Sequence, residues 1–428
     1  MKIKFLNHAS FLIQKDNINL ICDPYLYGSA FNNGWSLVVE GNHDLNNITH
    51  IYFSHEHPDH FSVPFLKNIN ESKRSNITVI FQDTFDKRVI NFCKKIGYKI
   101  LECSDEKRYK LCDNFFVTIG KIPIYDSWIL CEVDGLKLLN VNDCPIDESD
   151  AKRIFKKIGD CDILFTQFSY ACWLENKSKR VSEANKQLKK IKIQDEVFTP
   201  KFIVPFASFV YFSHEENFFM NDSINKPEDV NNFILEKCKG YPIVFQLNEE
   251  WDGILKKDNS SSLAFWKEKY SNILPRKNII VTNPIKNFLD LQLKANFYKK
   301  KLIKDNNIFL VYIFSIFLFR SVNFFLIDLN VFCKFSWFTG LKKIKAIDKN
   351  YISLNSDNLA FIFEHNYGLD TLFVNARFLS SEFLTLKMIK LFLLGSLNNI
   401  GIYLKFRDIH KFLNFRVLKR GFLSLFFN

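Results

Sequence analysis

Residues 51–62 read Ile-Tyr-Phe-Ser-His-Glu-His-Pro-Asp-His-Phe-Ser, and this stretch decides what the rest of the chain is expected to form. Three histidines and two carboxylates fall within six residues, directly after an apolar, aromatic run. Histidine is the commonest metal ligand among side chains, and carboxylates suit harder divalent ions. Residues 51–53 read as the end of a buried strand, so the cluster is predicted to lie on the loop that leaves it.

The spacing within this cluster favours two neighbouring metal ions. In extended backbone, residues i and i+2 point to the same side, so His55 and His57 can share one ion. Asp59 and His60 follow as the chain turns, and they are expected to face a second ion. The alternative is a polar surface loop that happens to hold three histidines. The whole chain has 9 histidines in 428 residues, and such grouping is typical of metal or catalytic sites.

The order His-x-His-x-Asp-His resembles the signature of the metallo-β-lactamase superfamily. Residues 7–13, followed by the Cys-Asp-Pro-Tyr of residues 22–25, resemble the opening hairpin of that superfamily, with Asn7 in place of its usual glycine. The loop of residues 28–35 narrows the resemblance. With this loop and the histidine cluster, the sequence is similar to the metallo-β-lactamase-like domain of CMP-N-acetylneuraminate hydroxylases and the bacterial proteins grouped with them.

The resemblance implies a centre of two divalent metal ions. Asp143 follows an expected strand over residues 136–141 and takes the place of the aspartate that bridges the two metals; an Asx turn at a strand end is the alternative. His214 is taken as the last histidine ligand, because no other histidine lies between residues 61 and 364. The expected ligands are His55, His57, Asp59, His60, Asp126, Asp143 and His214.

Asp126 is in this set by position, because one expected histidine is missing. The family pattern has a further histidine between the cluster and the bridging aspartate, and this chain has none from 61 to 213. Asp126 is either its substitute or an ordinary turn residue beside an incomplete site. A carboxylate ligand would favour iron, as in the diiron members of the superfamily, although zinc and manganese also accept oxygen ligands. The expected metals are therefore zinc or iron, with manganese as a further candidate.

Other residues are expected to surround the metals. Asp23 is expected to orient a histidine ring of the metal loop from behind. His8 either lines the metal pocket or is a structural turn histidine. Three aromatic residues, Trp35, Tyr170 and Trp173, are expected to line the substrate pocket.

The length of the chain fits two domains, or one large domain with additions. We predict an α/β fold: a metallo-β-lactamase-like αββα sandwich over residues 1–290, and an additional α-rich or α+β region of unknown role over residues 291–428. The apolar stretch 308–319 is too short to span a bilayer, which needs about 20 residues. It is expected to form a buried helix that packs on the catalytic domain.

The chain carries a net charge of +12 and 47 phenylalanines. Codon bias of an AT-rich genome and an anionic partner are both open explanations. The expected partner is a small anionic substrate, such as a sugar nucleotide or phosphosugar, and no nucleic acid is expected. Residues 387–394 and 407–427 pair Phe and Leu with Lys and Arg; they form either a peripheral membrane contact or a solvated face. Ten cysteines without a C-x-x-C pair, and no signal-peptide pattern in residues 1–5, indicate a cytoplasmic protein.

These observations leave three hypotheses. In the first, the chain is a metal-dependent hydrolase of an anionic sugar, nucleotide or ester-type substrate, in which Asp59 orients a metal-activated water or takes its proton. In the second, it is a diiron monooxygenase that hydroxylates a sugar nucleotide. Its electrons are then expected from a separate protein, because the chain lacks the Cys-x-His pairs of a Rieske cluster. In the third, the fold has lost its activity, and the intact histidine cluster argues against this.

Overall fold

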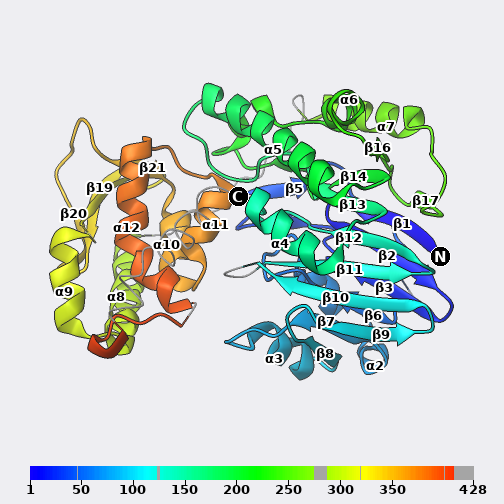
Figure 1. The fold of residues 1–428 in the computed structure, drawn as a ribbon. Helices are drawn as coiled ribbons and strands as arrows, with labels where there is room; N and C mark the ends of the chain where they lie inside the picture. Colours follow the sequence, from blue (N-terminus) through cyan, green and yellow to red (C-terminus); the bar gives the residue numbers. More distant parts are fainter. Residues whose placement is uncertain (46, 123–125, 274–286, 319, 400, 409–428) are drawn as a thin grey trace.

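The computed structural model describes residues 1–45, 47–122, 126–273, 287–318, 320–399 and 401–408 (Figure 1). Two seven-stranded sheets form the larger, N-terminal part. The first has the order β17(Glu250–Trp251), β1(Lys2–Asn7), β2(Ser10–Lys15), β3(Ile18–Cys22), β6(His50–Tyr52), β7(Thr78–Gln82), β8(Lys99–Cys103). The second has the order β16(Tyr241–Pro242), β14(Phe202–Phe206), β13(Ile163–Gln167), β12(Leu136–Asn140), β11(Ser127–Val133), β10(Phe115–Lys121), β9(Arg108–Cys112).

The two sheets pack face to face because each turns an apolar face inward. Phe11 of the first sheet stacks on Phe165 of the second with ring centroids 4.4 Å apart, and its ring also meets Phe206 edge-on. Neighbours such as Ile13 and Val117 are fully buried in the same core. Aromatic and β-branched residues favour strands and pack well across such an interface.

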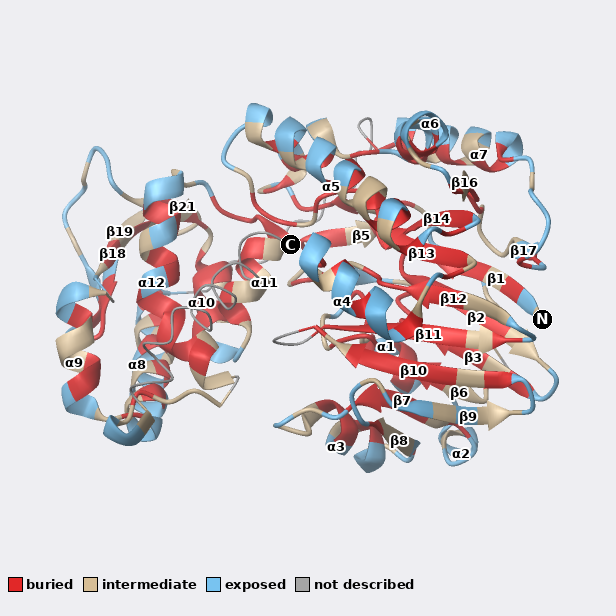
Figure 2. Cartoon of the chain, in the orientation of Figure 1, coloured by how far each residue is buried: buried red, intermediate tan, exposed pale blue. Residues whose placement is uncertain are grey.

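Helices cover the outer faces of both sheets (Figures 1 and 2). On the first sheet, α1(Val63–Asn68) and α3(Arg88–Lys95) bury apolar residues against β7. On the second sheet, α4(Glu148–Ile158) buries Ala151, Ile154 and Ile158, which share one helical face. The long α5(Lys177–Phe198) crosses beside α4, while α6(Pro227–Lys237) and α7(Ser260–Ser271) contribute to the inner core. The predicted αββα sandwich is confirmed.

The remaining chain forms an α+β region, also as predicted. Its four-stranded sheet has the order β20(Gly340–Lys343), β19(Val331–Ser336), β18(Val322–Leu326), β21(Ile352–Leu354). Its helices are α8(Phe288–Asp305), α9(Ile308–Phe317), α10(Ser356–Glu364), α11(Gly368–Asn375) and α12(Glu382–Asn399). The predicted boundary after residue 290 lies within α8, and the division into two domains stays a prediction.

One apolar core joins this region to an edge of the sandwich. That edge carries a small sheet of β15(Val210–Phe212), β5(Trp35–Leu37) and β4(Ser29–Ala30), followed by the 3₁₀ helix η1(Phe218–Ser223). Phe31 and Trp35 share a buried cluster with residues of α10, α11 and α12. The C-terminal region therefore packs on two segments at this edge of the sandwich. One segment precedes the metal loop in sequence, and the other follows it.

One expectation about the C-terminal third needs correction. Helix α9 buries Leu310 and Val311 next to α8, at the end of the molecule far from the sandwich (Figure 1), so residues 308–317 do not pack on the catalytic domain. Residues 387–394 lie in α12, where most of the apolar side chains are buried in the core, so this segment offers no apolar face. Most of the segment 407–427 lies outside the described residues. Among the residues described, no helix is both long and apolar enough to cross a membrane.

Candidate metal centre

The histidine cluster occupies the loop that follows β6, as the sequence predicts. The chain leaves the strand through the buried Phe53 and Ser54 and then turns tightly. The amide of His60 donates to the carbonyl of His57 over 3.0 Å, and this turn brings the later residues of the cluster back over the earlier ones. The ring centroids of His55 and His60 are consequently 4.3 Å apart.

Six side chains form two adjacent groups of potential metal ligands. His55, His57 and Asp143 make the first group, and His8, Asp59 and His60 make the second. Within each group, the candidate ligand atoms all lie within 4.8 Å of one another. Five of these six residues are expected ligands; the sixth is His8, which the sequence placed either in the pocket or in a turn.

Asp143 lies between the two groups, on the loop after β12. One carboxylate oxygen is 3.9 Å from Nε2 of His55, and the other is 3.4 Å from Nε2 of His60. This is the position that a carboxylate shared by two ions requires. The bridging role itself stays a prediction.

The polar atoms of these groups fit a metal centre. Within these two groups, five buried atoms have no hydrogen-bond partner in the described structure: Nε2 of His55, Nε2 of His60, Nδ1 of His8, Oδ1 of Asp59 and Oδ1 of Asp143. A buried polar atom without a partner costs free energy, and native proteins avoid it unless another group satisfies the atom. Imidazole nitrogens and carboxylate oxygens are the ligands that zinc and non-haem iron accept.

The electrostatics of the cluster are those of a cation site. Burial lowers the pKa of His55 well below its usual value, so the ring is neutral, which is the form that binds metals. Burial alone would raise the pKa of Asp143, but the charges of His60 and His55 outweigh it and hold the pKa well below the usual range. Burial likewise opposes protonation of His60, but Asp143, Asp59 and Asp23 raise its pKa well above the usual value. Without an ion, a proton on His60 therefore balances the surrounding carboxylates.

Asp23 ties the ring of His60 to the backbone of the metal loop. Its Oδ2 lies 3.0 Å from Nδ1 of His60, and its Oδ1 accepts a hydrogen bond from the amide of Ser54 over 2.8 Å. Asp23 is fully buried at the end of β3 with a φ of +41°. Nε2 of His60 is thereby turned toward Asp59 and Asp143. Carboxylates behind ligand histidines commonly fix the ring in this way.

We predict that Asp23→Asn weakens metal affinity by about 10–100-fold, because an amide orients the His60 ring less firmly and makes it less basic. Asparagine tolerates the left-handed backbone at this position, so the fold should persist. Titration with zinc in the presence of a competing chelator measures the effect. Asp16→Asn is the matched control, since Asp16 is an exposed aspartate with a φ of +51°. An unchanged affinity in Asp23→Asn would contradict this role.

Asp126 lies on the other side of His55. Its Oδ1 is 3.6 Å from Nδ1 of His55, whereas Nε2 of that ring faces Asp143. Burial, followed by the charge of Asp143, raises the pKa of Asp126 to about 8. Asp126 belongs to neither ligand group, and Nδ1 of His55 is hydrogen-bonded instead to Oγ of Ser54, 3.0 Å away. A direct bond from Asp126 to a metal stays a prediction.

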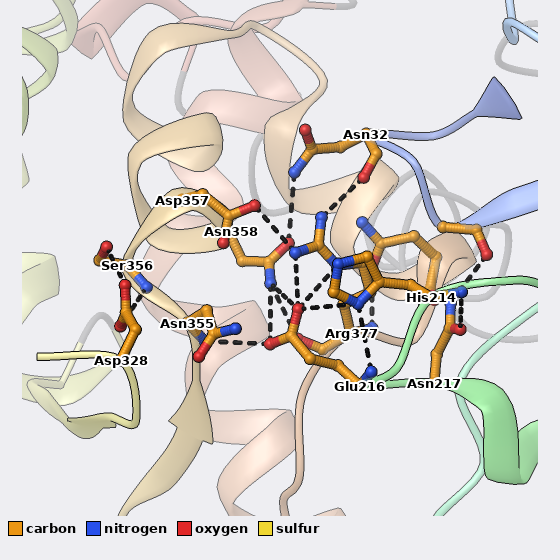
Figure 3. A network of polar contacts seen from close by, with 12 residues as sticks. Asn32, His214, Glu216, Asn217, Asp328, Asn355, Ser356, Asp357, Asn358 and Arg377 are labelled. Atoms are coloured by element: carbon orange, nitrogen blue, oxygen red, sulfur yellow. Dashed lines mark hydrogen bonds and ion pairs between the residues drawn. The ribbon is translucent and has the colours of Figure 1, made fainter. Parts of the chain in front are cut away.

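His214 also belongs to neither group, although it is buried. Its Nδ1 accepts a hydrogen bond from the amide of Glu216 over 3.1 Å, and its amide donates to Oδ1 of Asn217. Burial, followed by the nearby charge of Arg377, lowers the pKa of His214 to about 3. Figure 3 shows this ring within a polar network to which both the N-terminal part and the C-terminal region contribute. The geometry thus gives His214 a structural setting, and a ligand role finds no support in it.

Arg377 is the centre of that network (Figure 3), and no sequence pattern pointed to it. It lies just after α11 and is fully buried. Its Nε donates to Glu216 over 2.8 Å, its Nη2 to Asp357 over 2.8 Å, and its Nη1 to the carbonyl of Asn32 over 2.7 Å. The bond to Asn32 reaches the loop whose Phe31 ring lies 5.6 Å from the ring of His57. A lone arginine without a motif carries no sequence signature of such a role.

Replacing Arg377 with methionine should destabilise the protein by about 3–5 kcal/mol, because two half-buried carboxylates lose their fully buried counter-charge. Urea unfolding monitored by circular dichroism gives the free energy of unfolding. Arg153→Met is the control, since Arg153 is exposed and pairs with Glu106 at the surface; its cost should stay below about 1 kcal/mol. If both variants lose the same free energy of unfolding, the network around Arg377 stabilises the protein no more than a surface ion pair does.

The C-terminal region also reaches the metal loop from a second side. Arg88 of α3 lies 3.7 Å from Glu56 and donates a hydrogen bond to the hydroxyl of Tyr367. Asp370 of α11 has an Oδ1 that is shielded from solvent without a partner among the described residues. Burial, followed by the charge of Glu56, raises the pKa of Asp370 to about 7.

This raised pKa has a consequence for stability. An aspartate in the unfolded chain titrates near pH 3.9, so the folded state binds the Asp370 proton more tightly. The contribution of Asp370 is then greatest below about pH 4 and is lost as the pH rises through about 7. We predict that Asp370→Asn raises the melting temperature at about pH 8 relative to the unmodified protein, and raises it less at about pH 5. The exposed Asp160→Asn should show no such difference, and a pH-independent effect at Asp370 would refute the assignment.

Two of the three expected pocket aromatics lie beside the metal groups. Trp35 and Tyr170 line a cavity of about 20 Å³ together with Asp59 and Asp143. Trp173 is placed elsewhere: its ring stacks on Phe378 with centroids 4.9 Å apart, so it belongs to the joint with the C-terminal region. The expectation that Trp173 lines the pocket is corrected, because the packing of the C-terminal region could not be read from the sequence.

The chain was compared with known proteins. Residues 2–189 match the family model described as "Beta-lactamase superfamily domain". The chain is 26% identical over 258 residues to the cytidine monophosphate-N-acetylneuraminic acid hydroxylase of Cricetulus griseus, covering 56% of this chain and 46% of that relative. The match thus spans less than half the length of this relative.

Solved structures with a similar fold include proteins of two kinds. One is a possible metal-dependent hydrolase from Veillonella parvula, with a TM-score of 0.43 and 14% identity over 59% of this chain and 98% of that one. Another is CmlA, a diiron β-hydroxylase from Streptomyces venezuelae, with a TM-score of 0.40 and 12% identity over 58% of this chain and 53% of that one. Likenesses at this level do not choose between the two reactions. Residues 2–189 are thus similar to a β-lactamase superfamily domain, and the resemblance first seen in the histidine cluster is confirmed.

Proposed function

We propose that the chain is a dinuclear metal-dependent hydrolase that acts on a small anionic sugar, nucleotide or ester-type substrate. One observation carries this proposal. Asp59 and Asp143 both line a cavity of about 20 Å³, which is room for about one water molecule. Each of these carboxylates keeps one buried oxygen without a hydrogen-bond partner among the described residues. A water held there lies beside one carboxylate of each ligand group.

The residues of the site have separate tasks in this reaction. His55, His57 and Asp143 would hold one divalent ion, and His8, Asp59 and His60 would hold a second. Such ions would supply Lewis-acid activation of a water and of the substrate oxygen. Asp59 orients the attacking water and accepts its proton. Nε2 of His8, 3.2 Å from Oδ2 of Asp59, fixes the plane of that carboxylate.

The electrostatics of Asp59 suit this task. Burial would raise its pKa, but the charges of His60 and His8 outweigh burial and keep the pKa below its usual value. Asp59 is therefore ionised in the resting site. Trp35 and Tyr170, which are both buried, form the apolar part of the same cavity and limit access of bulk water. The positive net charge of the chain favours an anionic substrate.

A second function is favoured by the curated relatives. These are named as CMP-N-acetylneuraminic acid hydroxylases, and the chain matches less than half of their length. In this alternative the chain is a diiron monooxygenase that hydroxylates a sugar nucleotide with electrons from a separate partner. Two histidines and a carboxylate in each group suit iron and oxygen chemistry as well as zinc.

A paired assay separates the two functions. The full chain, loaded with zinc, manganese or iron, is incubated with bis(p-nitrophenyl) phosphate and p-nitrophenyl acetate. In parallel, the iron form receives CMP-N-acetylneuraminate, oxygen and a chemical reductant, and mass spectrometry looks for an added oxygen atom. The proposal expects metal-dependent hydrolysis. It also expects Asp59→Asn to lower kcat by about 10²–10⁴-fold. The exposed Asp113→Asn should retain full activity.

The hydrolase and the monooxygenase predict different results in these assays. Hydroxylation that requires oxygen, with no hydrolysis of either ester, would replace the hydrolase by the monooxygenase. Hydrolysis that survives Asp59→Asn unchanged would remove Asp59 from the reaction, provided that the metal content of the variant equals that of the unmodified chain.

A further inference from the structure

The solvent-facing half of α9 carries only aliphatic and aromatic side chains. Successive residues of a helix are about 100° apart, so one half of α9 presents six side chains, namely Ile308, Phe309, Tyr312, Ile313, Ile316 and Phe317. Phe309 is 62% exposed and Phe317 is 74% exposed, while Tyr312 and Ile313 are half-buried. The opposite half, with Leu310 and Val311, packs into the C-terminal core. A contiguous exposed apolar face of this kind marks an interaction surface.

A basic cavity lies against the same helix. Its volume is about 520 Å³, and Ser315 and Ile316 of α9 form one wall, with the half-exposed Phe338 near them. Four cationic side chains are among the other lining residues: Arg320, Lys334, Lys342 and Lys343. Across the described ranges, none of these four forms an ion pair with a carboxylate, and all four are exposed. Nζ of Lys343 lies over the face of the Phe288 ring, 5.1 Å from its centroid.

We infer that α9 and this basic cavity form a surface that binds an anionic membrane from one side. An amphipathic helix with a strongly apolar face lies in the plane of the headgroups with that face inserted. Lysines and arginines at its border attract anionic lipids. Here Ile316 and Phe338 line the basic cavity itself, so the inserted and the cationic parts form one continuous surface. The ten residues of α9 extend over about 15 Å, half of the hydrocarbon thickness, so the helix lies on the bilayer.

The positive charge of this surface argues against two other binding partners, a second copy of the chain and the chain's own C-terminal residues. A second copy of the chain would bring an identical cluster of cations toward the first one. The chain's own residues 409–428 contain four Lys or Arg residues and no Asp or Glu, so they repel the cavity as well. Phosphate headgroups of anionic lipids complement both the apolar face and the four cations. The surface lies at the end of the C-terminal region far from the sandwich (Figures 1 and 2), so a membrane bound there leaves the sandwich uncovered.

Co-sedimentation with vesicles tests this inference. The full chain is mixed with phosphatidylcholine vesicles and with phosphatidylcholine–phosphatidylglycerol vesicles, at low and high salt. We expect binding to the anionic vesicles and a sharp decrease in binding at high salt. Phe317→Glu should weaken binding at least about tenfold. Lys334→Gln and Lys342→Gln should each weaken it about fivefold.

Two controls match these variants. Leu255→Glu changes an equally exposed apolar residue, 66% exposed, on the sandwich, and Lys267→Gln changes an exposed lysine there. Both should bind like the unmodified chain. Because every altered residue is exposed, melting curves should be unchanged, and a variant with a lowered melting temperature is replaced by Phe309→Glu.

Three results would overturn the inference. They are no binding of the unmodified chain to anionic vesicles, equal binding to neutral and anionic vesicles, or a loss of binding in the sandwich controls as large as in the variants of the proposed surface. Sedimentation velocity without lipid adds a fourth. If the unmodified chain is a dimer that Phe317→Glu separates into monomers, a second copy occupies the surface instead of a bilayer.

Discussion

The structure depends on a set of buried ligand atoms that the polypeptide itself leaves unsatisfied. Ring nitrogens of His8, His55 and His60 and single oxygens of Asp59 and Asp143 meet at one edge of the sandwich without partners in the described residues. Such atoms are costly unless a cation completes them. The surroundings are arranged to hold them in place. Asp23 fixes His60, Ser54 lies between His55 and His60, and the turn at residues 57–60 brings both groups together.

The C-terminal region is part of this arrangement. Through Arg377 it holds the carbonyl of Asn32 and the carboxylate of Glu216, and through Asn375 it holds the carbonyl of Phe31. Phe31 in turn packs against His57. The region therefore braces two loops beside the metal centre. Its opposite end, with α9 and the basic cavity, faces away from the site and is free for another role.

The sequence predicted the centre of the site better than its edges, for physical reasons. His55, His57, Asp59 and His60 lie within one short loop, so local spacing alone brings them together. Asp143 and Asp23 could be placed because each ends a recognisable strand. Asp126 and His214 were assigned by position in a family pattern, and the structure brings neither into the two ligand groups. Trp173, Arg377 and the outer face of α9 depend on how the C-terminal region packs, and no local pattern encodes contacts between residues more than a hundred positions apart.

The central claim is that the two ligand groups hold metal ions, and metal content tests it most directly. The full chain is purified from cells supplied with iron, zinc and manganese, and the metal per chain is measured by inductively coupled plasma mass spectrometry. The account predicts about two ions per chain, one for each group, and about half as much or less in His60→Ala. A chain that is folded, by its melting curve, and carries no stoichiometric metal under any of these conditions would contradict it.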